Sequence, residues 1–107
     1  MALYIVLLDE MGTRVRDVPD PDGGTFDAAG DFDTLLDLAG PWQMWSRLDP
    51  YEDTELDHEQ AALLLSDIAR LRPLAQTGIE TRGLDRLAAL ASICTHRPGY
   101  TLRFDGD

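Results

Sequence analysis

The sequence has 107 residues, of which 44% are hydrophobic, and a formal net charge of −11 at neutral pH. This length suits one core, so we expect residues 1–107 to form a single domain. The chain has no lysine, and its surplus of carboxylates argues against nucleic acid and anionic membranes as direct ligands, because both need clustered cations. Cys94 is the only cysteine, which excludes an intrachain disulfide and fits a cytoplasmic protein.

The negative charge is concentrated in the first part of the chain. Residues 1–60 hold 15 acidic residues and three arginines, a net charge of −12, whereas residues 61–107 hold five acidic residues and six arginines, a net charge of +1. The acids gather in two segments, at 20–33 and at 49–59. They form either a solubilising surface or, if both segments fold onto one side, a binding face for a basic partner.

The N-terminal third predicts a hairpin, a loop and a short helix. The apolar run Ala2–Leu8 is typical of a core strand, being too short to span a bilayer and lacking the layout of a signal peptide. Gly12 suits a tight turn, and residues 13–18 predict the returning strand. Three glycines, one proline and three aspartates predict a loop at 20–30. Apolar residues at helical spacing predict a short helix over 31–39.

Two longer helices are predicted in the second half of the chain. Asp57 begins the clearest one, which we expect at 58–72, and Gln60 completes the pattern of a capping box. A linker is expected at 74–80. A second helix is predicted at about 83–95, because its leucines and alanines fall on one stripe.

The chain ends in a predicted strand. Tyr100, Leu102 and Phe104 alternate with polar residues, which is typical of a half-buried strand, and we expect it to pair with Ala2–Leu8. The predicted fold is therefore α+β. It has a small, mainly antiparallel sheet, made of the N-terminal hairpin and the C-terminal strand, and about three helices cover it.

Two motifs carry a resemblance. The turn sequence Asp49–Thr54 (DPYEDT), with Leu56-Asp57 and Gln60 after it, resembles a motif shared by an uncharacterised group of small bacterial proteins. The ending Tyr100–Asp107 (YTLRFDGD) is similar to that group's aromatic strand closing in Gly-Asp. The similarity spans roughly residues 42–107, and Glu52 departs from it where the group has glycine. The resemblance implies a domain of this size but no activity, cofactor or catalytic residue.

Aromatic residues beside the second acidic segment form the candidate interaction face. Segment 42–48 fits both helical spacing and alternation, and we expect a short extended piece there. Apolar anchors rimmed by carboxylates suit a basic partner. The alternative, which is the default in a small domain, places both tryptophans in the core. The candidate binding residues are Trp42, Trp45, Tyr51, Glu52, Asp53 and Glu55.

Metal and thiol chemistry have weaker support. Six carboxylates lie within residues 49–59, but they lack the spacing of a calcium-binding loop, and a turn followed by a helix start explains them. Cys94 lies on the apolar stripe of its predicted helix, which indicates a buried, inert thiol. His96 is placed to stabilise the end of that helix as a cation. We therefore predict no metal site, no cofactor and no catalytic residue.

These observations favour a non-enzymatic cytoplasmic interaction module. Its acidic half would engage a basic protein surface, as an immunity protein, an antitoxin or a DNA mimic does. One alternative is a small hydrolase or divalent-metal-dependent enzyme that uses the carboxylates at 49–59. Another is a homo-oligomeric structural protein.

Overall fold

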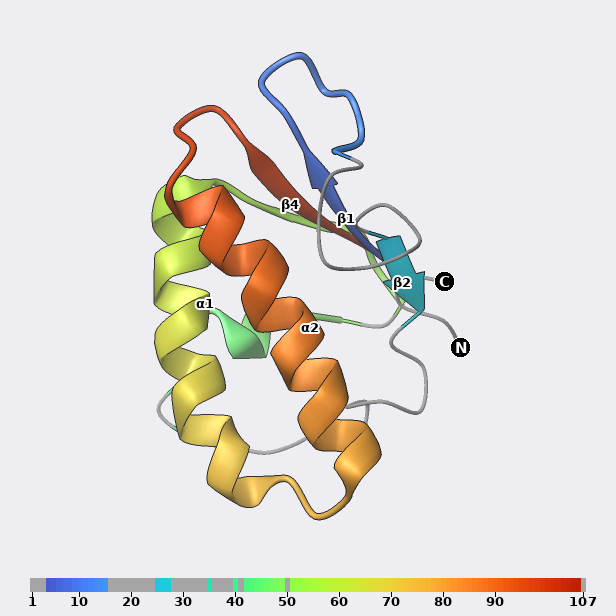
Figure 1. Cartoon of the computed structure of the whole chain (residues 1–107), viewed down its shortest axis with the longest axis vertical. Helices are drawn as coiled ribbons and strands as arrows, with labels where there is room; N and C mark the ends of the chain where they lie inside the picture. Colours follow the sequence, from blue (N-terminus) through green and yellow to red (C-terminus); the bar gives the residue numbers. More distant parts are fainter. Residues whose placement is uncertain are drawn as a thin grey trace.

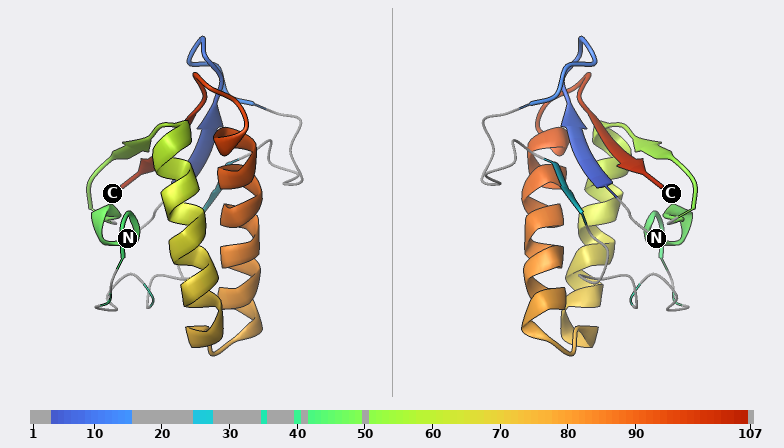
Figure 2. Two further views of the ribbon diagram at one scale, coloured as in Figure 1. Left: turned by 90° about the vertical axis from the view of Figure 1, so that its left-hand side faces the viewer. Right: turned by 90° about the vertical axis from the view of Figure 1, so that its right-hand side faces the viewer.

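The computed structural model describes residues 4–15, 25–27, 35, 40, 42–49 and 51–106. These residues form an α+β fold in which a four-stranded antiparallel sheet carries two α-helices on one face (Figure 1). The predicted fold class is confirmed. The two side views show both helices on the same side of the sheet (Figure 2). Within the described residues, no helix combines the length and apolarity needed to cross a membrane.

The sheet joins the two ends of the described chain. Its strands are β1 (Tyr4–Leu8), β2 (Thr25–Asp27), β3 (Thr54–Leu56) and β4 (Thr101–Asp105), in the spatial order β2-β1-β4-β3. β1 and β4 pair along their full length, which confirms the predicted pairing of the first and last strands. Strand β3, which lies in the acidic segment at 49–59, was not predicted.

The β1–β4 pair supplies the sheet side of the core. Leu102 and Phe104 are fully buried, and they lie opposite Leu7 and Ile5 across the ladder. The intervening β4 residues are only partly buried. This alternation places the apolar residues against the helices and leaves Arg103 on the other face.

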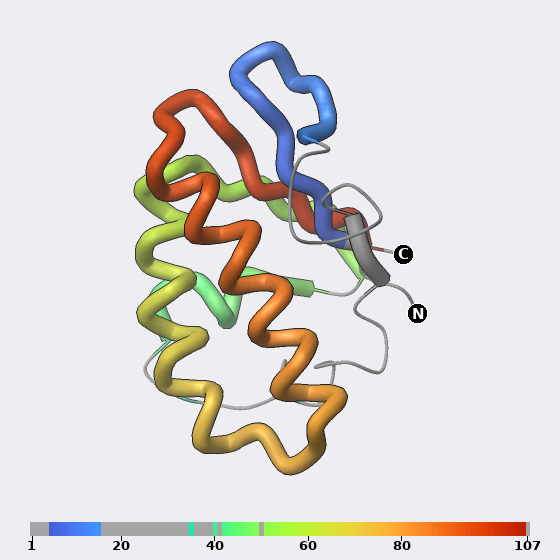
Figure 3. Tube along the Cα trace, in the orientation of Figure 1, coloured from blue at the N-terminus to red at the C-terminus, as the bar shows by residue number. Residues whose placement is uncertain are grey.

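The N-terminal hairpin is only partly as predicted. The Asp9 carboxylate accepts hydrogen bonds from the backbone N–H groups of Met11 and Thr13, at 2.9 Å each, and Gly12 has a φ of 77°. The returning chain makes one bridge, Leu8 to Arg14, and the rest of the predicted strand lies outside the described residues. At one end of the molecule this turn lies beside the turn at 96–99 (Figure 3).

Two predictions between residues 20 and 39 have different outcomes. The loop prediction at 20–30 is wrong at Thr25–Asp27, which form β2 against β1. A three-residue strand gives too short an alternation to stand out among glycines and aspartates. The predicted helix at 31–39 lies outside the described residues except for Leu35, which is buried.

Two α-helices follow β3. α1 spans His58–Leu71, and its capping box is confirmed: the Asp57 carboxylate accepts from the Gln60 N–H at 2.8 Å, and the Gln60 side chain accepts from the Asp57 N–H at 3.0 Å. α2 spans Gly78–Thr95 and begins five residues earlier than predicted. A second capping box, between Thr77 and Glu80, starts it inside the predicted linker.

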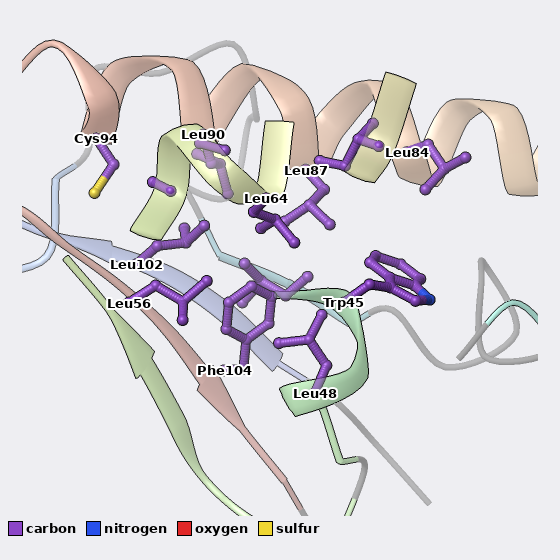
Figure 4. Close-up of a cluster of buried hydrophobic side chains, with 14 of the residues drawn as sticks. Trp45, Leu48, Leu56, Leu64, Leu84, Leu87, Leu90, Cys94, Leu102 and Phe104 are labelled. Carbon is purple, nitrogen blue, oxygen red and sulfur yellow. The ribbon is translucent and has the colours of Figure 1, made fainter. Parts of the chain in front are cut away.

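The core lies between the two helices and the sheet. Helices α1 and α2 run side by side and contribute leucines that meet the inner face of β1 and β4 (Figure 4). The 3₁₀ helix η2 (Trp45–Arg47) closes one side of this core. The largest fully buried side chains are Trp45, Phe104, Ile5, Leu7, Leu56, Leu64, Ile68, Leu71, Leu84, Leu87 and Leu90.

Candidate functional site

A buried carboxylate fixes the segment that leads to the second acidic stretch. Asp67 of α1 has no exposed surface, and its oxygens accept hydrogen bonds from the backbone N–H groups of Gln43, Met44 and Trp45. The N···O distances run from 2.7 Å for Met44 to 3.1 Å for Gln43. These amides precede and open η2, where a negative charge is favourable. Asp67 therefore ties this segment to α1.

Trp45 belongs to the core. Its side chain has no exposed surface, and its indole Nε1–H donates to the carbonyl oxygen of Leu35 at 2.8 Å. Its assignment to an interaction face is therefore wrong, and the core alternative holds for this residue. Trp42 is partly buried and packs against the same core. Segment 42–48 contains η2 and not the expected extended piece, because Asp67 caps a helical turn there.

The other four candidate residues are exposed and lie together in sequence. We call Tyr51, Glu52, Asp53 and Glu55 the acidic rim. Tyr51 is 68% exposed. The Asp49 carboxylate accepts from the Tyr51 N–H at 2.9 Å, and the Asp49 carbonyl accepts from the Glu52 N–H at 3.1 Å, so a tight turn presents the phenol ring to solvent. The rim continues into β3, the strand at one edge of the described sheet.

One arginine lies within this group of carboxylates. Arg103 of β4 is the cross-strand partner of Glu55, and its Nε–H donates to Asp105. The hydrogen bond and charge of Asp105 raise the pKa of Arg103, and the charges of Asp53 and Glu55 add to this effect. The guanidinium therefore stays charged and offsets part of the negative charge of the rim.

The rim is also fixed by Gly106, the residue that follows β4. The Gly106 N–H donates to the Asp53 carboxylate at 3.0 Å. A Cβ on Gly106 would lie 2.3 Å from the carbonyl oxygen of Glu52, so only a glycine fits against this turn. The two motifs that carry the sequence resemblance are thus in direct contact.

We expect Gly106→Ala to lower the free energy of unfolding by about 1–3 kcal/mol, because the added methyl group meets backbone atoms that cannot rotate away. Gly78→Ala is the matched control, since a Cβ there has nothing within 4 Å and α2 gains a better helix former. Urea denaturation followed by tryptophan fluorescence measures both. Equal stability of the two variants would contradict this account of the turn.

The remaining candidate groups are the carboxylates at 49–59, Cys94 and His96. Within the described residues, no three His, Cys, Asp or Glu side chains converge in a way that could hold a metal ion, so the carboxylates at 49–59 do not gather around a common point. Cys94 is buried, and burial first and the charge of Asp57 second raise its pKa to about 11, as expected for an inert thiol. His96 caps α2, and its Nδ1 lies 2.8 Å from the Ser92 carbonyl oxygen.

Sequence reasoning missed the residues that shape the rim. Asp67 has a visible signal, because it lies on the apolar stripe of α1 between Leu64 and Leu71, where an aspartate needs buried donors. Arg103 and Gly106 have no such signal in the sequence. Their roles depend on β4 lying beside β3 and on contact with the turn that precedes β3. The chain matches no protein-family model, no curated protein and no solved structure.

Proposed function

We propose that the protein is a non-enzymatic interaction module whose acidic rim binds a basic surface on another protein. The observation that carries the proposal is the exposed ring of Tyr51, followed in the chain by the exposed residues Glu52, Asp53 and Glu55. An aromatic anchor flanked by charge is the arrangement that concentrates binding energy at protein interfaces. The net charge of −11 adds long-range attraction for a cationic partner.

The anchoring of the rim supports this proposal. Asp67 holds the segment before it, and Gly106 contacts its turn, so the backbone of the rim loses little freedom on binding. Arg103 offsets only part of the negative charge of the rim, so the rim stays attractive to cations. A toxin or a nucleic-acid-binding protein is a concrete partner, and the protein would neutralise it in the cytoplasm in the manner of an immunity protein, an antitoxin or a DNA mimic.

The test compares two variants that each remove one exposed apolar side chain and one exposed carboxylate. Tyr51→Ser/Glu52→Gln alters the rim, and Met11→Ser/Glu10→Gln alters the turn after β1, where Met11 is 82% exposed. Wild-type protein should capture a basic partner from native lysate at low salt and release it at high salt. Titration of that purified partner should give a Kd raised tenfold or more, about 1.4 kcal/mol or above, by the rim variant alone.

A partner that binds both variants equally would place the interface elsewhere. Capture of no salt-sensitive basic protein by the wild type would overturn the proposed function.

A further inference from the structure

The connection between α1 and α2 carries an exposed surface opposite in charge to the acidic rim. We call Arg72, Leu74, Ile79 and Arg82 the hairpin tip. Leu74 is 45% exposed and Ile79 is 50% exposed. Both arginines are exposed, and Arg72 forms an ion pair with Asp85. Residues 70–86 hold four arginines and two acids, a net charge of +2. One of those acids, Glu80, is nearly buried and caps α2.

The apolar part of the tip stays about half exposed, although the first turn of α2 is capped. Glu80 and Thr77 already satisfy the first turn of α2. Only five large hydrophobic side chains within the described residues are markedly exposed. Two of these lie in the tip and one, Tyr51, lies in the rim. Apolar residues beside cations at one place, and an aromatic residue beside carboxylates at another, are complementary surfaces.

We propose that the hairpin tip docks onto the acidic rim of a second copy of this chain. The inference rests on the proposed function, since it uses the rim as a site for a basic surface, and it names one such surface. Residues 49–59 hold six acids and no arginine, and Arg103 offsets only part of their charge. Arg82 and the ion-paired Arg72 of the tip therefore offer cations of the sign that the rim attracts. Leu74 and Ile79 would pack against the ring of Tyr51, which stays exposed in a single chain.

The positions of the two surfaces determine the kind of assembly. The tip lies at the end of the helices away from the sheet, and β3 lies at the edge of the sheet (Figure 2). One molecule therefore presents both surfaces at once, and the contact is head-to-tail, which extends or closes into a ring. The net charge of −11 opposes association, but charges farther apart than about 8 Å are screened at physiological salt. The contact is therefore expected to be weak and dependent on concentration.

Two variants and their mixture test this contact. Sedimentation velocity of the full chain, from about 10 µM to about 1 mM, detects self-association with a Kd within that range of concentrations. The average molecular mass of the wild type should rise with concentration and exceed the mass of a dimer. Leu74→Ser/Ile79→Ser should abolish tip binding, and Tyr51→Ser/Glu52→Gln should abolish rim binding, so each should remain monomeric. Their equimolar mixture should form a heterodimer and nothing larger, because one intact tip and one intact rim remain.

Leu63→Ser is the control, since Leu63 is 39% exposed on α1 outside both surfaces and its loss should leave the assembly unchanged. A wild type that stays monomeric throughout, or a mixture without heterodimer, overturns the inference. Binding of the tip to anionic vesicles by a protein that stays monomeric would also overturn the inference. A monomeric wild type that still captures a foreign basic partner leaves the proposed function standing. Self-assembly of the wild type without capture of a foreign basic partner would support this inference and overturn the proposed function.

Discussion

Replacing Asp67 by alanine should lower the free energy of unfolding by about 3–5 kcal/mol. The carboxylate is fully buried, and the backbone N–H groups of Gln43, Met44 and Trp45 donate to it. Removal of its oxygens leaves these donors without acceptors. It also creates a small cavity between α1 and the segment at 43–45. The change should be the largest for any polar residue in the described part of the chain.

Two further variants separate charge from shape at this position. Asp67→Asn keeps the volume and one acceptor oxygen but turns an amide NH₂ toward backbone donors, so the loss should be roughly half as large. Ser66→Ala, at the exposed neighbouring position on α1, should change stability by less than about 0.5 kcal/mol. Urea denaturation followed by tryptophan fluorescence provides the readout. Similar stabilities for the alanine variants at 66 and 67 would contradict the role given to Asp67.

Truncating Trp45 to alanine should cost about 3–5 kcal/mol as well, through the loss of buried aromatic surface. The indole lies wholly inside the core, close to leucines of α2 (Figure 4). Trp45→Phe keeps most of the apolar contact but removes the donor to the Leu35 carbonyl, so its cost should be about 1–3 kcal/mol. Thermal unfolding by circular dichroism measures both.

The Asp67 and Trp45 effects should not be additive, because both residues hold the same segment of chain. A double variant should lose clearly less stability than the sum of the single losses. Full additivity would show that the two side chains act on separate parts of the structure. Tyr51→Ser gives the comparison for the surface, since a ring that is 68% exposed should contribute little to stability.

Local signals predicted the elements whose structure depends on near neighbours. The Asp57–Gln60 capping box marks the start of α1, and the alternation of Leu102 and Phe104 marks β4. The start of α2 had an equally local signal, since Thr77 and Glu80 also form a capping box, but a glycine-containing linker was predicted there instead. These features lie within a few residues of each other, so the sequence displays them directly.

The features that shape the rim depend on contacts between distant residues. Asp67 meets Met44 across 23 positions, and Gly106 meets Asp53 across 53 positions. Trp42 and Trp45 have similar sequence surroundings, yet Trp45 is fully buried and Trp42 only partly so. Burial of an aromatic residue is decided by which elements pack around it, and no local pattern around residues 42–48 records that. The exposure of Tyr51 followed from a turn sequence and was easier to anticipate.

The pairing of β1 with β4 also sets the order in which the protein can fold. Tyr4 lies opposite Asp105, so the central ladder of the sheet joins residues 101 positions apart. The helical hairpin α1–α2 needs only contacts within residues 58–95 and can form early. During synthesis, by contrast, β1 has no β4 to pair with until nearly all of the described chain has left the ribosome. Until then the backbone N–H and C=O groups that β1 later pairs with β4 are open to other strands, and its apolar side chains are uncovered. This interval is when the protein is most exposed to aggregation.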